Sequence, residues 1–153
     1  KGADSFAPVD TREAVTSALA MMEPQLRTRD VAITRTLPTE PAMILGDRMR
    51  LEQVIINLLR NALDATKGED DPSVDVLLTV GDTVRLSVRD NGPGIDDLDA
   101  LFEPFYTTKG EGTGLGLSIT HTIITSLGGR VEVHSHEGEG TEFRIYLPDS
   151  GQN

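Results

Sequence analysis

Leu51–Ala65 carries the most regular hydrophobic pattern in the chain. Its apolar residues recur every three or four positions: Leu51, Val54, Ile55, Leu58, Leu59, Ala62 and Leu63. This spacing predicts a helix with one buried face, and Asp47 is a good N-cap for it. Polar residues form a second stripe on another face: Gln53, Asn57, Arg60, Asn61 and Asp64. Asn is a poor helix former, so the pair Asn57 and Asn61 indicates either placed amide carbonyls or an ordinary solvated face.

Two further helices are predicted from the same periodicity. The first follows Asp10, with Asp10 as N-cap and Glu13 reaching back to complete a capping box. Pro24 is expected to kink this helix or to end it early. The last helix covers Leu115–Leu127 and ends at Gly128-Gly129, which suits a C-cap and turn.

Short alternating segments predict the strands. After an extended entry at Phe6–Val9, they are Val31–Leu37, Ala42–Leu45, Val74–Val80, Thr83–Arg89, Arg130–His134 and Thr141–Leu147. Gly81-Asp82 and Glu137–Gly140 are hairpin turns, and a short helix is expected near Asp97–Leu101. The order predicts an α/β fold: a two-layer sandwich with a mixed, mainly antiparallel sheet covered on one face by three helices.

Composition narrows the class of protein. The 153 residues predict one domain spanning 1–153, and the absence of Cys excludes disulfides, thiolate metal sites and a Cys nucleophile. There is no apolar run of ~20 residues and no signal-peptide pattern. Because the chain begins without Met, we expect it to be a piece of a longer protein.

The net charge of −11 argues against binding to nucleic acid or to anionic membranes. A polyanionic ligand would have to be attracted locally, through helix N-termini, a metal ion or a few placed cations. The clustering of the 15 glycines matters for this reason.

The first glycine cluster is Asp90–Ile95, Asp-Asn-Gly-Pro-Gly-Ile, directly after a predicted strand. Asp90 could accept a hydrogen bond from an exocyclic amine such as that of adenine, while Gly92 and Gly94 let a flat ligand approach the backbone. The alternative is a plain turn, since these residue types form turns in any protein.

The second cluster, Gly112–Leu117, opens the last helix. Its alternating glycines and the helix N-terminus suit phosphate. It is not a Walker loop, because no Gly-Lys-Ser/Thr follows, nor the dinucleotide fingerprint, because no strand precedes it. Between the clusters, Leu101–Gly110 is predicted to be a mobile lid, whose Thr107, Thr108 and Lys109 could reach phosphate oxygens. Alternatively its aromatics Phe102 and Phe105 simply anchor a loop in the core.

Together these segments resemble the ATP-binding catalytic domain of bacterial sensor histidine kinases, in the gyrase, heat-shock chaperone, kinase and mismatch-repair (GHKL) superfamily. Four boxes match in order: Asn57–Ala65 as the N box, Asp90–Ile95 and Gly112–Leu117 as the Gly boxes, and Phe102–Phe105 as the F box. The match covers nearly the whole chain and implies the Bergerat fold. The residues of Asn57–Ala65 and Phe102–Lys109 are most similar to those of nitrogen-regulation and dicarboxylate-transport sensor kinases.

The resemblance implies ATP and Mg²⁺ as cofactors and assigns roles. Asn61 corresponds to the magnesium ligand, and Asn57 to its polar partner one turn earlier. Asp90 corresponds to the carboxylate that binds adenine N6, with Gly94 against the base and Thr141 behind it. Lys109 and Thr108 fall where the lid contacts the terminal phosphates, and Gly112, Gly114 and Gly116 where backbone amides hold the phosphate chain. The other residues placed at the nucleotide are Asp64, Ala65, Gly92, Ile95, Phe102, Phe105, Thr107, Thr113, Leu115 and Leu117. That Arg60 faces phosphate is an inference from the polar stripe.

Position 57 separates branches of the superfamily. ATPase branches carry there a Glu that activates water, whereas the amide of Asn57 cannot act as a general base. The site is therefore expected to hold ATP for in-line transfer to an external acceptor. In the family that acceptor is a His on a dimeric helical hairpin. Neither His121, His134 nor His136 has that context, so this chain is expected to bind Mg·ATP without phosphorylating itself.

The implied partners are the chain's own missing phosphoacceptor and dimerisation helices and, indirectly, a response regulator, with no nucleic acid. The piece would be monomeric, the full-length protein a homodimer, and the domain cytoplasmic in an inner-membrane sensor. Three alternatives stay open: an ATP-hydrolysing member of the superfamily, a degenerate domain that serves as an interaction module, and a serine kinase acting on an anti-sigma partner, for which a Glu would be expected at position 57.

Overall fold

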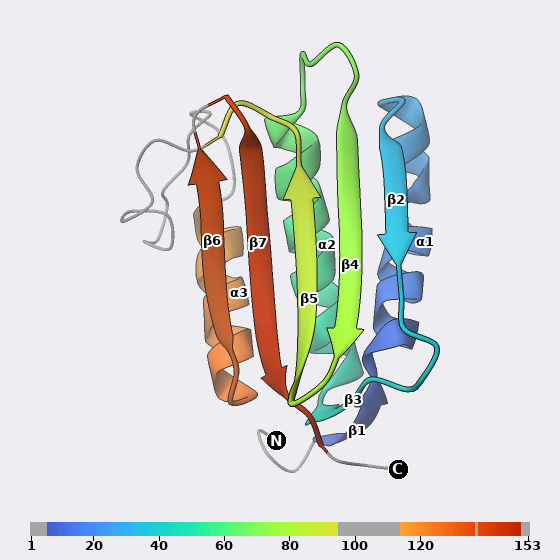
Figure 1. Cartoon of the computed structure of the whole chain (residues 1–153), viewed down its shortest axis with the longest axis vertical. Helices are drawn as coiled ribbons and strands as arrows, with labels where there is room; N and C mark the ends of the chain where they lie inside the picture. The colour runs from blue at the N-terminus through green and yellow to red at the C-terminus, as the bar shows by residue number, and fades with distance from the viewer. Residues whose placement is uncertain (1–5, 95–113, 137, 151–153) are drawn as a thin grey trace.

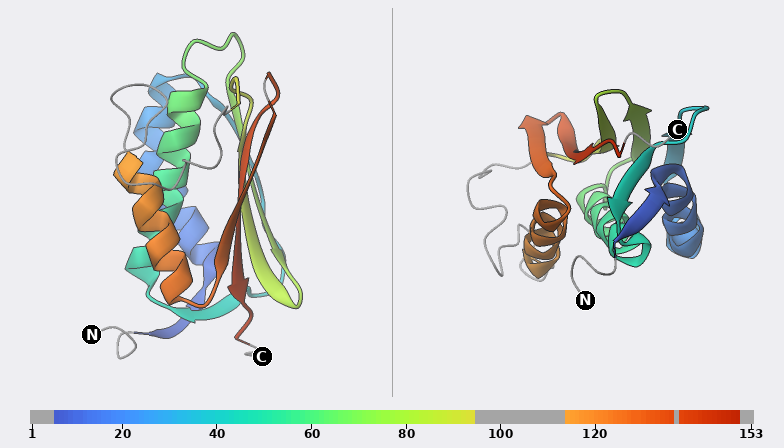
Figure 2. Two further views of the ribbon diagram at one scale, coloured as in Figure 1. Left: turned by 90° about the vertical axis from the view of Figure 1, so that its left-hand side faces the viewer. Right: turned by 90° about the horizontal axis from the view of Figure 1, so that it is seen from below.

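The computed structural model describes residues 6–94, 114–136 and 138–150. Within these ranges a five-stranded sheet lies against a layer of three helices (Figures 1 and 2). The helices are α1 (Thr11–Thr28), α2 (Arg48–Ala65) and α3 (Gly114–Ser126). The strands are β1 (Ala7–Asp10), β2 (Ala32–Thr36), β3 (Met43–Gly46), β4 (Ser73–Val80), β5 (Thr83–Asp90), β6 (Arg130–His136) and β7 (Gly140–Pro148). The predicted two-layer α/β fold is confirmed.

The sheet has the order β2-β4-β5-β7-β6. Its neighbouring strands are antiparallel except for β2 and β4, which pair in parallel. Strands β1 and β3 form a separate antiparallel ribbon, which the sequence did not predict. The amide of Ser150 donates to the Met43 carbonyl at 2.9 Å and so fastens the C-terminal segment to β3.

Helix α2 lies between α1 and α3 in the helical layer (Figure 2). The seven apolar residues that predicted it are all buried: Leu51, Val54, Ile55, Leu58, Leu59, Ala62 and Leu63. The Asp47 carboxylate accepts from the amides of Met49 and Arg50, which confirms it as the N-cap. The helix is therefore held by burial of one face and by capping of its first turn.

Two details of α1 differ from the predictions. Of the two effects expected of Pro24, a kink or an early end, the early end is wrong, because the helix continues to Thr28. Asp10 is the N-cap and accepts from the Arg12 amide, but the Glu13 carboxylate bonds Arg48 across the helix pair at 3.1 Å. Burial of Met22 and Leu26 on either side of Pro24 keeps the helix packed past the proline.

The core lies between the sheet and the helices and takes alternate residues of each central strand. None of the helices in the described part of the chain combines the length and the hydrophobicity that a membrane span requires. The predicted short helix at Asp97–Leu101 lies outside the described residues. One end of the sandwich carries the C-terminal end of α2, the ends of β5 and β6 and the starts of β7 and α3 (Figure 1).

Candidate functional site

The inner face of the sheet is apolar along most of its length and polar at that one end. On β5, Val84, Leu86 and Val88 are buried in the core, and the next inward residue is Asp90. Asp90 lies directly opposite Thr141 of β7, and the two residues are 5% and 3% exposed. Buried polar groups require hydrogen-bond partners, so a cross-strand pair of this kind is typical of a ligand site or of a structural network.

The loop after β5 runs directly against the end of α2. The Gly92 amide donates to the Asp90 carboxylate at 2.8 Å. A Cβ on Gly92 would lie 2.4 Å from the Ala65 carbonyl oxygen, a distance that no side chain could adopt. Glycine at 92 therefore places Asp90 beside the last turn of α2. The structure thus brings the first glycine cluster against Ala65, a contact that the sequence did not predict.

Side-chain bonds hold this loop from the other side as well. The Asn91 carboxamide accepts from the Ser73 amide at 2.9 Å and donates to the Asp71 carbonyl at 2.7 Å. Asn91 thus holds the end of β5 against the start of β4. The segment after Asp90 is therefore a turn that side-chain hydrogen bonds keep in place.

The hairpin between β6 and β7 also packs against the end of β5 and the loop that follows it. Gly140 has a φ of +90°, and a Cβ there would lie 2.1 Å from the Asp90 carbonyl oxygen. The Gly138 amide donates to the Pro93 carbonyl at 2.7 Å. Sequence reasoning treated Gly140 only as part of a turn. The pairing register that sets Gly140 and Thr141 beside the end of β5 would have indicated that Gly140 belongs to the site.

The polar stripe of α2 is arranged as predicted. Asn57 and Asn61 lie one turn apart and are half-buried, as is Asp64, whereas Arg60 is exposed. Among the described residues no group of three or more His, Cys, Asp or Glu side chains could hold a metal ion. Amide oxygens do suit Mg²⁺ when the ligand's own phosphates complete the coordination, because this ion keeps few protein ligands. The donors present therefore fit a metal that arrives with its nucleotide.

Several predicted site residues lie outside the described ranges. These are Ile95, Phe102, Phe105, Thr107, Thr108, Lys109, Gly112 and Thr113. Of the second glycine cluster, Gly114 is the first residue of α3, the backbone of Leu115 and Gly116 continues it, and Leu117 is buried in the core. The start of this helix and the C-terminal end of β5, whose last residue is Asp90, lie toward the same end of the sandwich (Figure 1).

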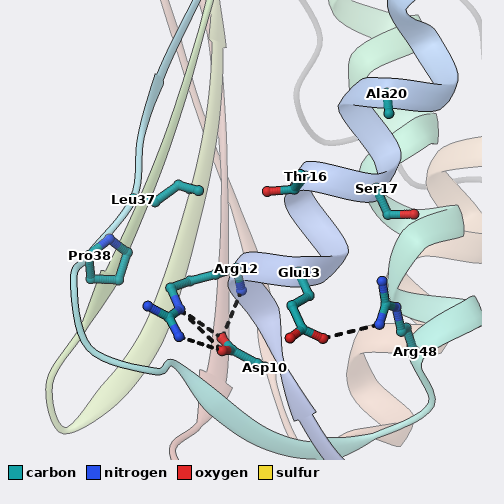
Figure 3. Close-up of a pocket in the computed structure, with 9 residues that line it drawn as sticks. All are labelled: Asp10, Arg12, Glu13, Thr16, Ser17, Ala20, Leu37, Pro38 and Arg48. Atoms are coloured by element: carbon teal, nitrogen blue, oxygen red, sulfur yellow. Dashed lines mark hydrogen bonds and ion pairs between the residues drawn. The ribbon is translucent and has the colours of Figure 1, made fainter.

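A hollow beside the N-terminal half of α1 (Figure 3) differs in chemistry from the Asp90 end of the sheet. It is lined by Asp10, Arg12, Glu13, Thr16, Ser17, Ala20, Leu37, Pro38 and Arg48. Its charges pair with each other: Arg12 with Asp10 at 2.7 Å, and Arg48 with Glu13. Hydrogen bonding to Arg12 holds the pKa of Asp10 below its ordinary value. Because these groups satisfy one another, we place the functional site at the Asp90 end.

The arrangement at the Asp90 end can hold a flat ring beside a buried carboxylate and a polyanion at the start of α3. Comparison with known proteins identifies the family of the domain. Residues 46–151 match the model for the histidine kinase-, DNA gyrase B- and HSP90-like ATPase domain. The chain belongs to this family. Within the family it is a catalytic domain of the histidine kinase type. The predicted resemblance to the catalytic domains of sensor histidine kinases is confirmed.

Its relatives in this family are sensor histidine kinases. The chain is 41% identical over 150 residues to the C4-dicarboxylate transport sensor protein DctB of Rhizobium meliloti, covering 96% of this chain and 24% of that protein. The catalytic domain of histidine kinase ThkA superposes with a TM-score of 0.83 at 31% identity, covering 94% and 95% of the two chains. Full-length ShkA in complex with AMPPNP gives a TM-score of 0.80 at 32% identity, covering 94% of this chain and 31% of that one. The chain thus spans about a quarter of DctB.

Proposed function

We propose that this domain binds Mg·ATP and supplies the γ-phosphoryl group for phosphorylation of a histidine on a separate dimerisation domain, as part of two-component signal transduction. The observation that carries the proposal is the buried pair Asp90 and Thr141, held directly opposite each other at the polar end of the sheet. ShkA, a structural relative at 32% identity, binds the ATP analogue AMPPNP, which supports a nucleotide as the ligand.

The adenine would lie at the Asp90 end. A carboxylate only accepts hydrogen bonds, so Asp90 suits the exocyclic amine of adenine. Its position is set by the two glycines whose backbones pack on either side, Gly92 against Ala65 and Gly140 against Asp90 itself. We assign Gly94, which has a φ of +91°, to the backbone that approaches the base.

The phosphates would lie toward α2 and α3. We assign Asn61 as the protein ligand of Mg²⁺, with Asn57 one turn earlier as its polar partner and Arg60 facing phosphate. The start of α3 at Gly114 offers amides and a partial positive charge to the phosphate chain. Lys109 and Thr108 are proposed to contact the terminal phosphates. Bound Mg²⁺ would neutralise charge on the phosphates during transfer.

The residue at position 57 favours transfer over hydrolysis. The carboxamide of Asn57 cannot take a proton from water, so the domain lacks a general base at the place where an ATPase would need one. Phosphoryl transfer depends mainly on positioning and charge neutralisation, and an incoming imidazole can attack without a base from this domain.

The acceptor is proposed to come from outside this chain. His121 lies exposed on α3, and His134 lies on β6 with its ring 3.2 Å from the Glu132 carboxylate. Neither belongs to a helical hairpin. We propose phosphoacceptor and dimerisation helices as the direct partner, a response regulator as the downstream one, and a cytoplasmic position in an inner-membrane homodimeric sensor.

Calorimetric titration of ATP, with and without Mg²⁺, tests this function. The parent chain is compared with Asn61→Ala and with Gln53→Ala, an exposed residue of the same stripe about 12 Å away along α2. We expect saturable, Mg²⁺-dependent binding that Asn61→Ala weakens and Gln53→Ala leaves unchanged, without steady phosphate release. Steady hydrolysis would instead support an ATPase, and no binding would support a degenerate interaction module.

A further inference from the structure

The polar row at the end of the sheet continues one strand beyond Asp90 and Thr141. Ser135 of β6 lies directly opposite Thr141, and the two preceding inward residues of β6, Val131 and Val133, pack against the core. The Ser135 hydroxyl lies 2.9 Å from the Thr141 hydroxyl and donates to the Gly140 carbonyl at 3.1 Å. Three adjacent strands thus present a carboxylate and two hydroxyls in one line.

The direction of these hydrogen bonds follows from counting protons. A serine hydroxyl has one proton, and a carbonyl oxygen can only accept. When Ser135 donates to the Gly140 carbonyl, its bond with Thr141 must use the proton of Thr141. The Thr141 hydroxyl is then an acceptor toward anything else that approaches it.

We propose that Ser135 is a positioning residue that fixes Thr141 as a hydrogen-bond acceptor and thereby makes the site select a purine with an amino group at position 6 over one with an oxo group. This inference rests on the proposed function. With Ser135 in place, both Asp90 and Thr141 accept, so the matching ligand edge is a donor. An oxo group would face acceptors alone, and such mismatches are costly in a buried site.

Removing Ser135 should change what the site accepts more than how well it folds. Without the serine oxygen, the Thr141 proton is free to turn toward a ligand. Thr141 could then donate to an oxo group at position 6, and the penalty against hypoxanthine would fall. A threonine at 135 keeps both the proton and the acceptor, so it should preserve the selection.

The test measures binding of ATP and ITP by calorimetry to the parent chain, Ser135→Ala and Ser135→Thr. ITP differs from ATP at position 6 and in the proton that its N1 carries, so the ratio of the two affinities reports the base edge. We expect Ser135→Ala to lower the ATP-to-ITP affinity ratio about five- to tenfold, the value of one hydrogen bond. Ser135→Thr should restore the ratio. Ser87→Ala is the control, because Ser87 is buried on the opposite face of β5.

A Thr141→Val background separates the inference from a general packing effect. There, Ser135→Ala should leave the ratio unchanged, because the hydroxyl it controls is gone; thermal unfolding confirms that each variant is folded. Equal weakening of ATP and ITP by Ser135→Ala, or the same ratio change in both backgrounds, would overturn the role of Ser135 while leaving ATP binding intact. Failure of the parent chain to bind ATP would overturn the proposed function and this inference with it.

Discussion

Gly140 approaches the Asp90 carbonyl so closely that a Cβ at position 140 would lie 2.1 Å from the oxygen. The contact joins the first residue of β7 to the last residue of β5, which are the two strands that carry the buried polar pair. The start of β7 therefore fixes the position of the Asp90 backbone, although Gly140 lies 50 residues after Asp90 in the sequence.

Replacing Gly140 with Ala should weaken both the fold and nucleotide binding. The substitution meets an unfavourable φ of +90° and a backbone clash together, so we expect a loss of about 2 kcal/mol or more in the free energy of unfolding. Urea denaturation and ATP titration measure the two effects. Gly138→Ala is the matched control: its φ is +81°, but nothing lies within 4 Å of the added Cβ. Equal losses of ATP affinity in both variants would contradict the role of the Asp90 contact.

Gly92→Ala tests the contact between the β5 loop and α2. The added Cβ would meet the Ala65 carbonyl at 2.4 Å, so the loop must move away from the helix. Forced repacking of this kind costs about 1–3 kcal/mol of stability, and we expect the ATP affinity to fall as well because Asp90 moves with the loop. Gly81→Ala, in the open turn between β4 and β5, should change neither quantity.

Asp90→Asn isolates the carboxylate itself. The amide oxygen can still accept from the Gly92 amide, so folding should be retained. Loss of a charge-assisted hydrogen bond to the adenine amine should weaken ATP binding by about 10- to 100-fold. Asp75→Asn, an exposed carboxylate on β4, serves as the comparison. An unchanged affinity in Asp90→Asn would place the adenine elsewhere.

The pair of Asp10 and Arg12 predicts a pH dependence of stability at the other end of the molecule. The hydrogen bond from Arg12 lowers the pKa of Asp10 in the folded chain. The stabilisation is therefore complete above the unfolded pKa of about 3.9 and is lost as the pH falls through the lower folded pKa. Asp10→Asn should cost up to about 1 kcal/mol at pH 7 and progressively less below pH 4. Denaturation across this range checks it. Arg12→Gln should reduce this slope without abolishing it, because the backbone amides of residues 12 and 42 still donate to Asp10. A slope that is unchanged in Arg12→Gln would contradict the assignment.

Local patterns predicted the elements well because each pattern reflects local burial. The central helix, for example, was set by the spacing of Leu51 to Leu63 and by its Asp47 cap, and both proved correct. Asp90 and Thr141 were also predicted as site residues, and the structure brings them together. The lid and the second glycine cluster up to Thr113 stay predictions, because they lie outside the described residues.

Features that depend on distant pairing were not predicted. The parallel pairing of β2 with β4 and the ribbon of β1 and β3 join segments separated by whole helices or loops. The positions of Gly140 and Ser135 relative to Asp90 likewise depend on strand order. Pro24 was expected to kink α1 or to end it early; the helix does not end there, because Met22 and Leu26 on either side of the proline are both buried in the core.

The location of bound nucleotide tests the central claim most directly. Two-dimensional amide NMR of the chain, titrated with Mg·ATP, reports each backbone position separately. We predict saturable shifts at Asn61, Asp90 and Thr141. We predict none at Ser17 and Arg48, which line the hollow beside the N-terminal half of α1. Shifts concentrated at that hollow, or a titration that leaves Asp90 and Thr141 unmoved while ATP binds, would contradict the assignment of the site.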